Sequence, residues 1–114
     1  MQKKWMKLIT PTIIILVILV AIVLIQGNKQ ETSEEIAKCI GEKSELYVQL
    51  GCHACKTQEE MFGDSYQYLN VIDCFYERNK CIEKNITATP TWIISKKEYV
   101  GVQTIEELKN LISC

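Results

Sequence analysis

The apolar block near the start of the chain constrains the fold most, because a soluble core of this size cannot accommodate it. The 18 residues from Leu8 to Ile25 contain no charged side chain. The hydrocarbon core of a bilayer is about 30 Å thick, and a helix of roughly 20 apolar residues crosses it. We therefore predict a transmembrane anchor at residues 8–25, preceded by a short segment at 1–7 and followed by a polar linker at 26–32.

A cleavable signal peptide is the alternative interpretation of this block. Lys3, Lys4 and Lys7 would then form its charged region. However, the apolar run is long for a signal peptide, and the sequence Leu24-Ile25-Gln26-Gly27 lacks small residues at both positions before a cut. An uncleaved anchor is the preferred prediction.

The distribution of charge predicts the orientation of the anchor. Three of the 13 basic residues precede the apolar block, which leaves ten basic against fourteen acidic residues after it. By the positive-inside rule, residues 1–7 are cytoplasmic and the domain at residues 33–114 lies outside a cell membrane crossed once. The six cysteines agree with this orientation, because disulfides form and persist on the outer side of the membrane. A mixed, acidic surface without a basic stripe gives no reason to expect a nucleic-acid partner, and we predict none.

The motif Cys52-His53-Ala54-Cys55 carries the chemistry. A short strand precedes it, Gly51 provides a turn, and a helix follows. A thiol at a helix N-terminus faces unpaired N–H groups and the positive end of the helix dipole, which favour its thiolate. His53 adds a cationic or hydrogen-bonding group that also stabilises the thiolate and makes the disulfide more oxidising. The motif predicts thiol–disulfide exchange.

Two other interpretations of the motif stay open. Cys52, Cys55 and His53 could hold copper or zinc, although a closed zinc site needs four ligands and the other cysteines are not spaced as a second pair. The pair could also be a structural disulfide in an inert interaction domain. Redox chemistry is preferred, and we expect no cofactor and no resident metal.

The pattern along residues 33–114 predicts an α/β domain. Ser33 caps a first helix that Gly41 ends, and Thr104 caps the last helix, which covers residues 105–112. Between them we expect strands at 45–50, 69–73, 91–95 and 98–102, a helix carrying the thiols up to residue 62, and a short helix at 78–84. This order gives a mixed central sheet with a parallel first pair, an antiparallel last pair, and helices on both faces.

The chain resembles the thioredoxin superfamily in this arrangement, in Cys52-His53-Ala54-Cys55 and in Thr89-Pro90, which matches the cis-proline. Over nearly all of residues 36–114 it resembles the thioredoxin-like domain associated with homologues of vitamin K epoxide reductase. The fused form of that family carries a four-helix enzyme, whereas this chain has one membrane segment. The segments that carry the closer resemblance are Ala37-Lys38-Cys39, Gly51 to Lys56, Met61-Phe62-Gly63, Cys74 with Cys81, Thr89-Pro90-Thr91-Trp92 and Gly101-Val102-Gln103-Thr104.

The resemblance implies roles for individual residues. It makes Cys52 the nucleophile, Cys55 the resolving cysteine and Pro90 a residue of the substrate loop. It also implies a structural disulfide between Cys74 and Cys81. Cys39 and Cys114 are then the remaining pair, and the alternatives are a free Cys114 thiol or a bond between molecules.

The expected activity is that of a membrane-anchored thiol–disulfide oxidoreductase acting outside the cytoplasm. The resemblance implies that its substrates are exported proteins and that a quinone-linked membrane partner reoxidises it. Net oxidation of substrates is preferred because of His53. An extracytoplasmic disulfide reductase is the closest alternative.

Overall fold

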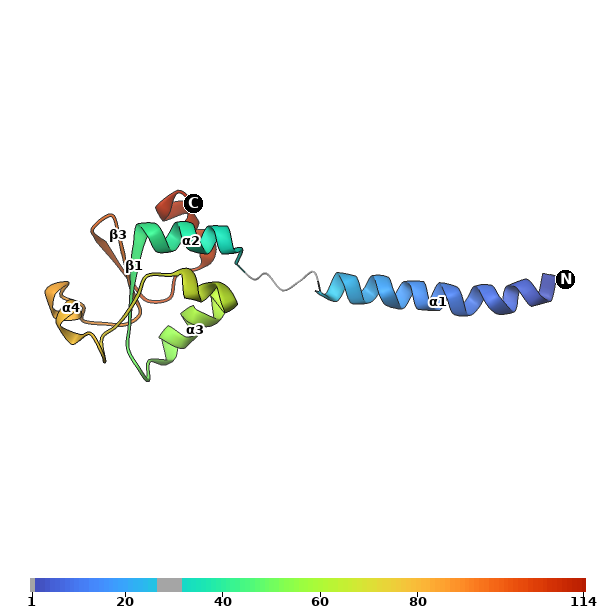
Figure 1. Cartoon of the computed structure of the whole chain (residues 1–114), viewed down its shortest axis with the longest axis horizontal. Coiled ribbons are helices and arrows are strands. Elements are labelled where there is room, and N and C mark those ends of the chain that lie inside the picture. Colours follow the sequence, from blue (N-terminus) through green and yellow to red (C-terminus); the bar gives the residue numbers. More distant parts are fainter. Residues whose placement is uncertain (1, 27–31) are drawn as a thin grey trace. The chain divides into compact units, whose positions relative to one another are not determined.

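The computed structural model describes residues 2–26 and 32–114. The chain forms two separate compact units (Figure 1). The first unit contains the long helix α1, and the second contains all the other helices and strands.

Helix α1 runs over Gln2–Gln26 and so begins before the predicted anchor at residues 8–25. Lysine and methionine are good helix formers, which explains the extension towards the N-terminus. The stretch Lys4–Ile25 is long and apolar enough to cross a membrane, and none of it is buried in the protein. Signal sequences share these properties, so the anchor, its orientation and the cytoplasmic segment at 1–7 stay predictions.

The predicted linker at residues 26–32 falls mostly on residues 27–31, which lie outside the described residues. Gln26 is the last residue of α1. Thr32 is buried in the domain: its hydroxyl donates to the carbonyl of Met61 at 3.3 Å, and its carbonyl accepts from the Ser65 hydroxyl at 2.7 Å. The domain therefore begins no later than Thr32, one residue before the predicted boundary.

A four-stranded mixed sheet with the order β2-β1-β3-β4 is the centre of the domain. As predicted, β1 and β2 are parallel and β3 and β4 are antiparallel; β1 also pairs antiparallel with β3. The strands are shorter than predicted: β1 is Ser44–Val48, β2 is Val71–Asp73, β3 is Thr91–Ile94 and β4 is Lys97–Val100.

Helices cover both faces of this sheet, and the apolar core is larger on one face than on the other. The larger apolar core joins the sheet to α2, α3 and α5, with Trp92 of β3 fully buried in it. On the other face Tyr47 and Ile72 pack against Cys81 of the short helix α4. Figure 1 accordingly shows α4 on the opposite side of β1 from α3. The helices are α2 Glu34–Lys43, α3 His53–Phe62, α4 Arg78–Glu83 and α5 Ile105–Ile112, with a 3₁₀ helix, η1, at Gly63–Tyr68.

The prediction that Gly41 ends the first helix is wrong, because α2 continues to Lys43. A Cβ atom at position 41 would collide with the backbone carbonyl of Tyr68 in η1. The glycine therefore allows close packing of two helices and does not act as a helix terminator. With this difference, the domain has the thioredoxin-like α/β fold that the sequence predicts.

Candidate active site

The thiol pair lies where β1 passes into α3. Gly51 has a φ of 84°, in the region that favours glycine, and it makes the turn between the two elements. The Cys52 N–H donates to the carbonyl of Gln49 at 3.0 Å, which closes this turn. Cys52 is the N-cap of α3, and its Sγ accepts a hydrogen bond from the Cys55 N–H at 3.1 Å. The helix N-terminus thus faces the Cys52 sulfur, as the motif predicts.

The two sulfurs are bonded to each other and differ in accessibility. Cys52 is partly exposed, whereas Cys55 is only 6% exposed and belongs to the main core. His53 is exposed at the first position of α3. A molecule that approaches from solvent therefore reaches the Cys52 sulfur first.

The loop that contains Thr89 and Pro90, which we call the proline loop, lies next to the thiol pair. The Thr89–Pro90 peptide bond is cis, and the Pro90 ring is fully buried immediately before β3. The Cys52 Sγ lies 3.6 Å from the Thr89 carbonyl oxygen. In the disulfide form that sulfur has no hydrogen, so only the reduced thiol can donate to this carbonyl. The Gly101 N–H donates to the Pro90 carbonyl at 2.8 Å and fixes the loop from its other side.

Asp73, at the end of β2, holds the loop that leads into the motif. Its Oδ1 accepts from the Leu50 N–H at 3.2 Å and from the Phe75 N–H at 2.9 Å. One carboxylate oxygen therefore joins the segment before Cys52 to the segment after β2. The sequence shows an acidic residue at a strand end, but it does not show that this residue reaches the motif.

Gln58 is the most important site residue that the sequence analysis missed. It is fully buried in α3, and its Oε1 accepts from the Trp92 indole N–H at 3.0 Å and from the Gln103 N–H at 2.8 Å. Its Nε2 donates to the Gln103 carbonyl at 3.0 Å. One amide therefore connects the thiol helix to β3, which follows the proline loop, and to the segment before α5. A polar residue at i+3 from Cys55, on the buried face of α3, was the available signal.

We expect Gln58→Leu to lower the free energy of unfolding by about 3 kcal/mol, since buried groups left without partners cost about 1–3 kcal/mol each. The groups that lose their partner are the Trp92 N–H and both backbone groups of Gln103. Urea unfolding of the full-length protein in neutral detergent micelles measures the change.

Gln67→Leu is the matched control for this variant. The Gln67 amide donates one hydrogen bond, to the carbonyl of Asp64, and the residue is exposed. Its replacement is expected to change stability by no more than about 0.5 kcal/mol. Equal losses for the two leucine variants would contradict the structural role assigned to Gln58.

The other four cysteines form two disulfides away from the motif. Cys74 is bonded to Cys81, which joins the end of β2 to α4. Cys39 of α2 is bonded to Cys114, across a sequence separation of 75 residues. Within residues 2–26 and 32–114, no group of three metal-binding side chains is arranged to hold a metal ion.

Tyr66 of η1 and the carboxylates of Glu59 and Asp73 line the same hollow as Cys52 and Cys55. Burial raises the pKa of Tyr66 to about 12, with smaller contributions from the charges of Glu59 and Asp73. The phenol therefore stays protonated at neutral pH. It remains a neutral hydroxyl close to two carboxylates.

The chain is similar to several solved structures, at low sequence identity. The chain is similar to the NTD_N/C domain of alkylhydroperoxide reductase AhpF from Enterococcus faecalis, at 20% identity and a TM-score of 0.45, over 72% of this chain and 45% of that one. It is also similar to oxidised thioredoxin from Plasmodium falciparum, at 19% identity and a TM-score of 0.46, over 73% of this chain and 91% of that one. No protein-family model matches the chain. The strand order and the position of the Cys52–Cys55 pair make this a thioredoxin-like fold with a CxxC motif.

Proposed function

We propose that this protein is a membrane-anchored thiol–disulfide oxidoreductase that forms disulfides in exported proteins. The observation that carries the proposal is the accessible Cys52 sulfur at the N-terminus of α3, bonded to the buried Cys55 and next to the cis-proline loop. This placement exposes the Cys52 sulfur to attack and shields the Cys55 sulfur from solvent.

The reaction transfers two electrons from a substrate dithiol to the protein. A substrate thiolate attacks the Cys52 sulfur, the Cys52–Cys55 bond breaks, and Cys55 leaves as a thiolate that takes up a proton. The second substrate thiolate then attacks the substrate sulfur of the mixed disulfide. Cys52 leaves as a thiolate, which is stabilised by the helix N-terminus and the Cys55 N–H. The substrate is released with a disulfide, and the protein holds two reduced cysteines.

A membrane partner that uses a quinone would return the protein to its disulfide form. This part of the proposal is supported by the resemblance of residues 36–114 to domains associated with vitamin K epoxide reductase homologues. The apolar helix α1 and the lysines that precede its apolar stretch support an anchor with the domain outside. Labelling of reduced Cys52 in intact cells by a membrane-impermeant maleimide tests the location. A Cys55→Ser variant that traps a mixed disulfide tests the partner.

The reduction potential of the Cys52–Cys55 pair tests the direction of electron flow. It is measured on the full-length protein in neutral micelles equilibrated with glutathione buffers. A value above about −180 mV supports disulfide formation, because disulfide isomerases and oxidants have such potentials. A value near about −270 mV, as in thioredoxin, would replace the oxidant by a reductase.

We expect His53→Ala to lower this reduction potential by about 30 mV, a tenfold change in the equilibrium constant. His53 follows Cys52 directly and is the first residue of α3, where a cationic or hydrogen-bonding imidazole would stabilise the thiolate and hence the reduced form. Thr57→Ala, one turn further along α3 and also exposed, is the control and should leave the potential unchanged. An unchanged potential in His53→Ala would show that the imidazole does not set the redox balance.

A further inference from the structure

A groove adjoins the thiol pair on the side of β2, and we call it the β2-side groove. It runs from the motif along the exposed side of α3 to η1 and the end of β2. Its buried and half-buried parts are formed by Val48, Tyr66 and Val71, and exposed Leu50 and Tyr76 border it. Both Cys52 and Cys55 line it, so a polypeptide lying in the groove reaches the reactive disulfide.

Negative charge dominates this groove. Four carboxylates line it, against one ammonium group and the imidazole of His53. The four are Glu59, Glu60, Asp73 and Glu77, and the ammonium group is that of Lys56. A substrate segment with a positive charge would therefore complement the groove, and one with a negative charge would be repelled.

The carboxylates of α3 are the ones available to a ligand. Glu77 is in an ion pair with Lys80 at 2.6 Å, and Asp73 uses an oxygen to hold the two loops. Glu59 and Glu60 are exposed, and in the described part of the chain neither is in an ion pair.

We propose that the β2-side groove selects protein substrates in which a lysine or arginine adjoins the reacting cysteine. The apolar parts of the groove receive the substrate backbone and its apolar neighbours, while Glu59 and Glu60 pair with the basic side chain. This inference rests on the proposed function, since the substrate is held where its thiolate can attack the Cys52 sulfur. The groove would then give the protein a preference for basic substrates, which the disulfide by itself does not have.

The test compares three dithiol peptides that differ only in the residue before the first cysteine, which is lysine, glutamine or glutamate. Oxidation of each peptide by the full-length protein in neutral micelles is followed at low salt. We expect Glu59→Gln with Glu60→Gln to lower the ratio of the lysine rate to the glutamate rate about fivefold, the effect of one exposed ion pair. In about 0.5 M salt the wild-type ratio should approach that of the variant.

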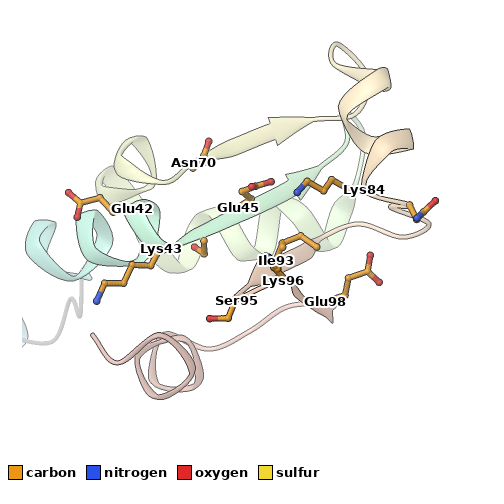
Figure 2. A pocket seen from close by; sticks show the side chains of 11 residues that line it. Glu42, Lys43, Glu45, Asn70, Lys84, Ile93, Ser95, Lys96 and Glu98 are labelled. Carbon is orange, nitrogen blue, oxygen red and sulfur yellow. The ribbon is translucent and has the colours of Figure 1, made fainter.

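The matched control is Glu42→Gln with Glu98→Gln, which removes the same charge at residues that do not line the β2-side groove. Figure 2 shows both residues beside a second pocket, which Ile93 and Glu45 also line. Both glutamates are exposed. Because every variant meets the same peptides, differences between the peptide thiols themselves cancel in the comparison.

The outcomes separate this inference from the proposed function. A ratio that falls in the Glu59/Glu60 variant and stays within about twofold in the control supports the groove. Equal ratios in all three proteins, with rapid exchange, overturn the substrate preference and leave the oxidoreductase intact. Failure of the wild-type protein to exchange with any peptide overturns both.

Discussion

Cys52→Ser is expected to lower the rate of disulfide exchange by at least about 1,000-fold, as the loss of a nucleophile does in other enzymes. Cys52 is the partly exposed sulfur of the pair, and Cys55 is buried in the core. A hydroxyl at position 52 forms no disulfide with Cys55 and no mixed disulfide with a substrate. The rate of oxidation of a dithiol peptide by the full-length protein measures the effect.

Cys55→Ser should behave differently from Cys52→Ser. The Cys52 thiolate is retained, so it can attack the disulfide of oxidised glutathione, which releases one glutathione thiolate and leaves a mixed disulfide that no Cys55 thiolate can resolve. We expect a covalent adduct to accumulate with Cys55→Ser and none with Cys52→Ser, as seen by mass spectrometry without reductant. Adducts with the opposite assignment would exchange the two roles.

Ala54→Ser is the control for both cysteine variants. Ala54 is exposed between the two cysteines, and its replacement leaves both thiols in place. It should keep the exchange rate within a few-fold of the wild type. A comparable loss in Ala54→Ser would mean that the cysteine variants act by disturbing the start of α3.

Removing the disulfide between Cys39 and Cys114, by replacing both residues with alanine, is expected to cost about 4.5 kcal/mol of stability. The bond closes a loop over a sequence separation of 75 residues, and the entropy of the unfolded chain rises when it is lost. Both cysteines are partly exposed, so the alanines leave little cavity. The free energy of unfolding in urea, measured in neutral micelles, gives the value.

The second structural disulfide provides the comparison. Cys74 and Cys81 are only seven residues apart, and the same chain-entropy model gives about 2.5 kcal/mol for their replacement. We therefore expect the larger loss for Cys39 and Cys114. The reverse order would show that unfolded-chain entropy is not the main contribution of these bonds.

Local signals in the sequence predicted the ends of α5 well. Thr104 caps the helix through its hydroxyl, which accepts from the Glu107 N–H at 3.1 Å, and the Glu107 carboxylate accepts from the Thr104 N–H at 2.8 Å. The helix covers residues 105–112, as predicted. The position of Cys52 at the start of α3 followed from the same kind of signal. Such features depend on residues within one turn of each other.

Features that depend on distant residues were not predictable from one sequence. The role of Gly41 is set by the backbone of Tyr68, and the hydrogen bonds of Gln58 are set by Trp92 and Gln103. Residues 63–68, which the pattern left unassigned, form η1, and β2 begins at Val71 and not at residue 69. In each case packing between elements decided the outcome over local preference.

The long disulfide has a consequence for the order of events during synthesis. Cys39 is made 75 residues before Cys114, which takes roughly 4–15 s at about 5–20 residues per second. Cys52, Cys55, Cys74 and Cys81 all appear in that interval, and each is a wrong partner for Cys39. The pairing of Cys39 therefore cannot be decided as the nascent chain emerges. This disulfide can form only after residue 114 has been made and brought next to Cys39 of α2.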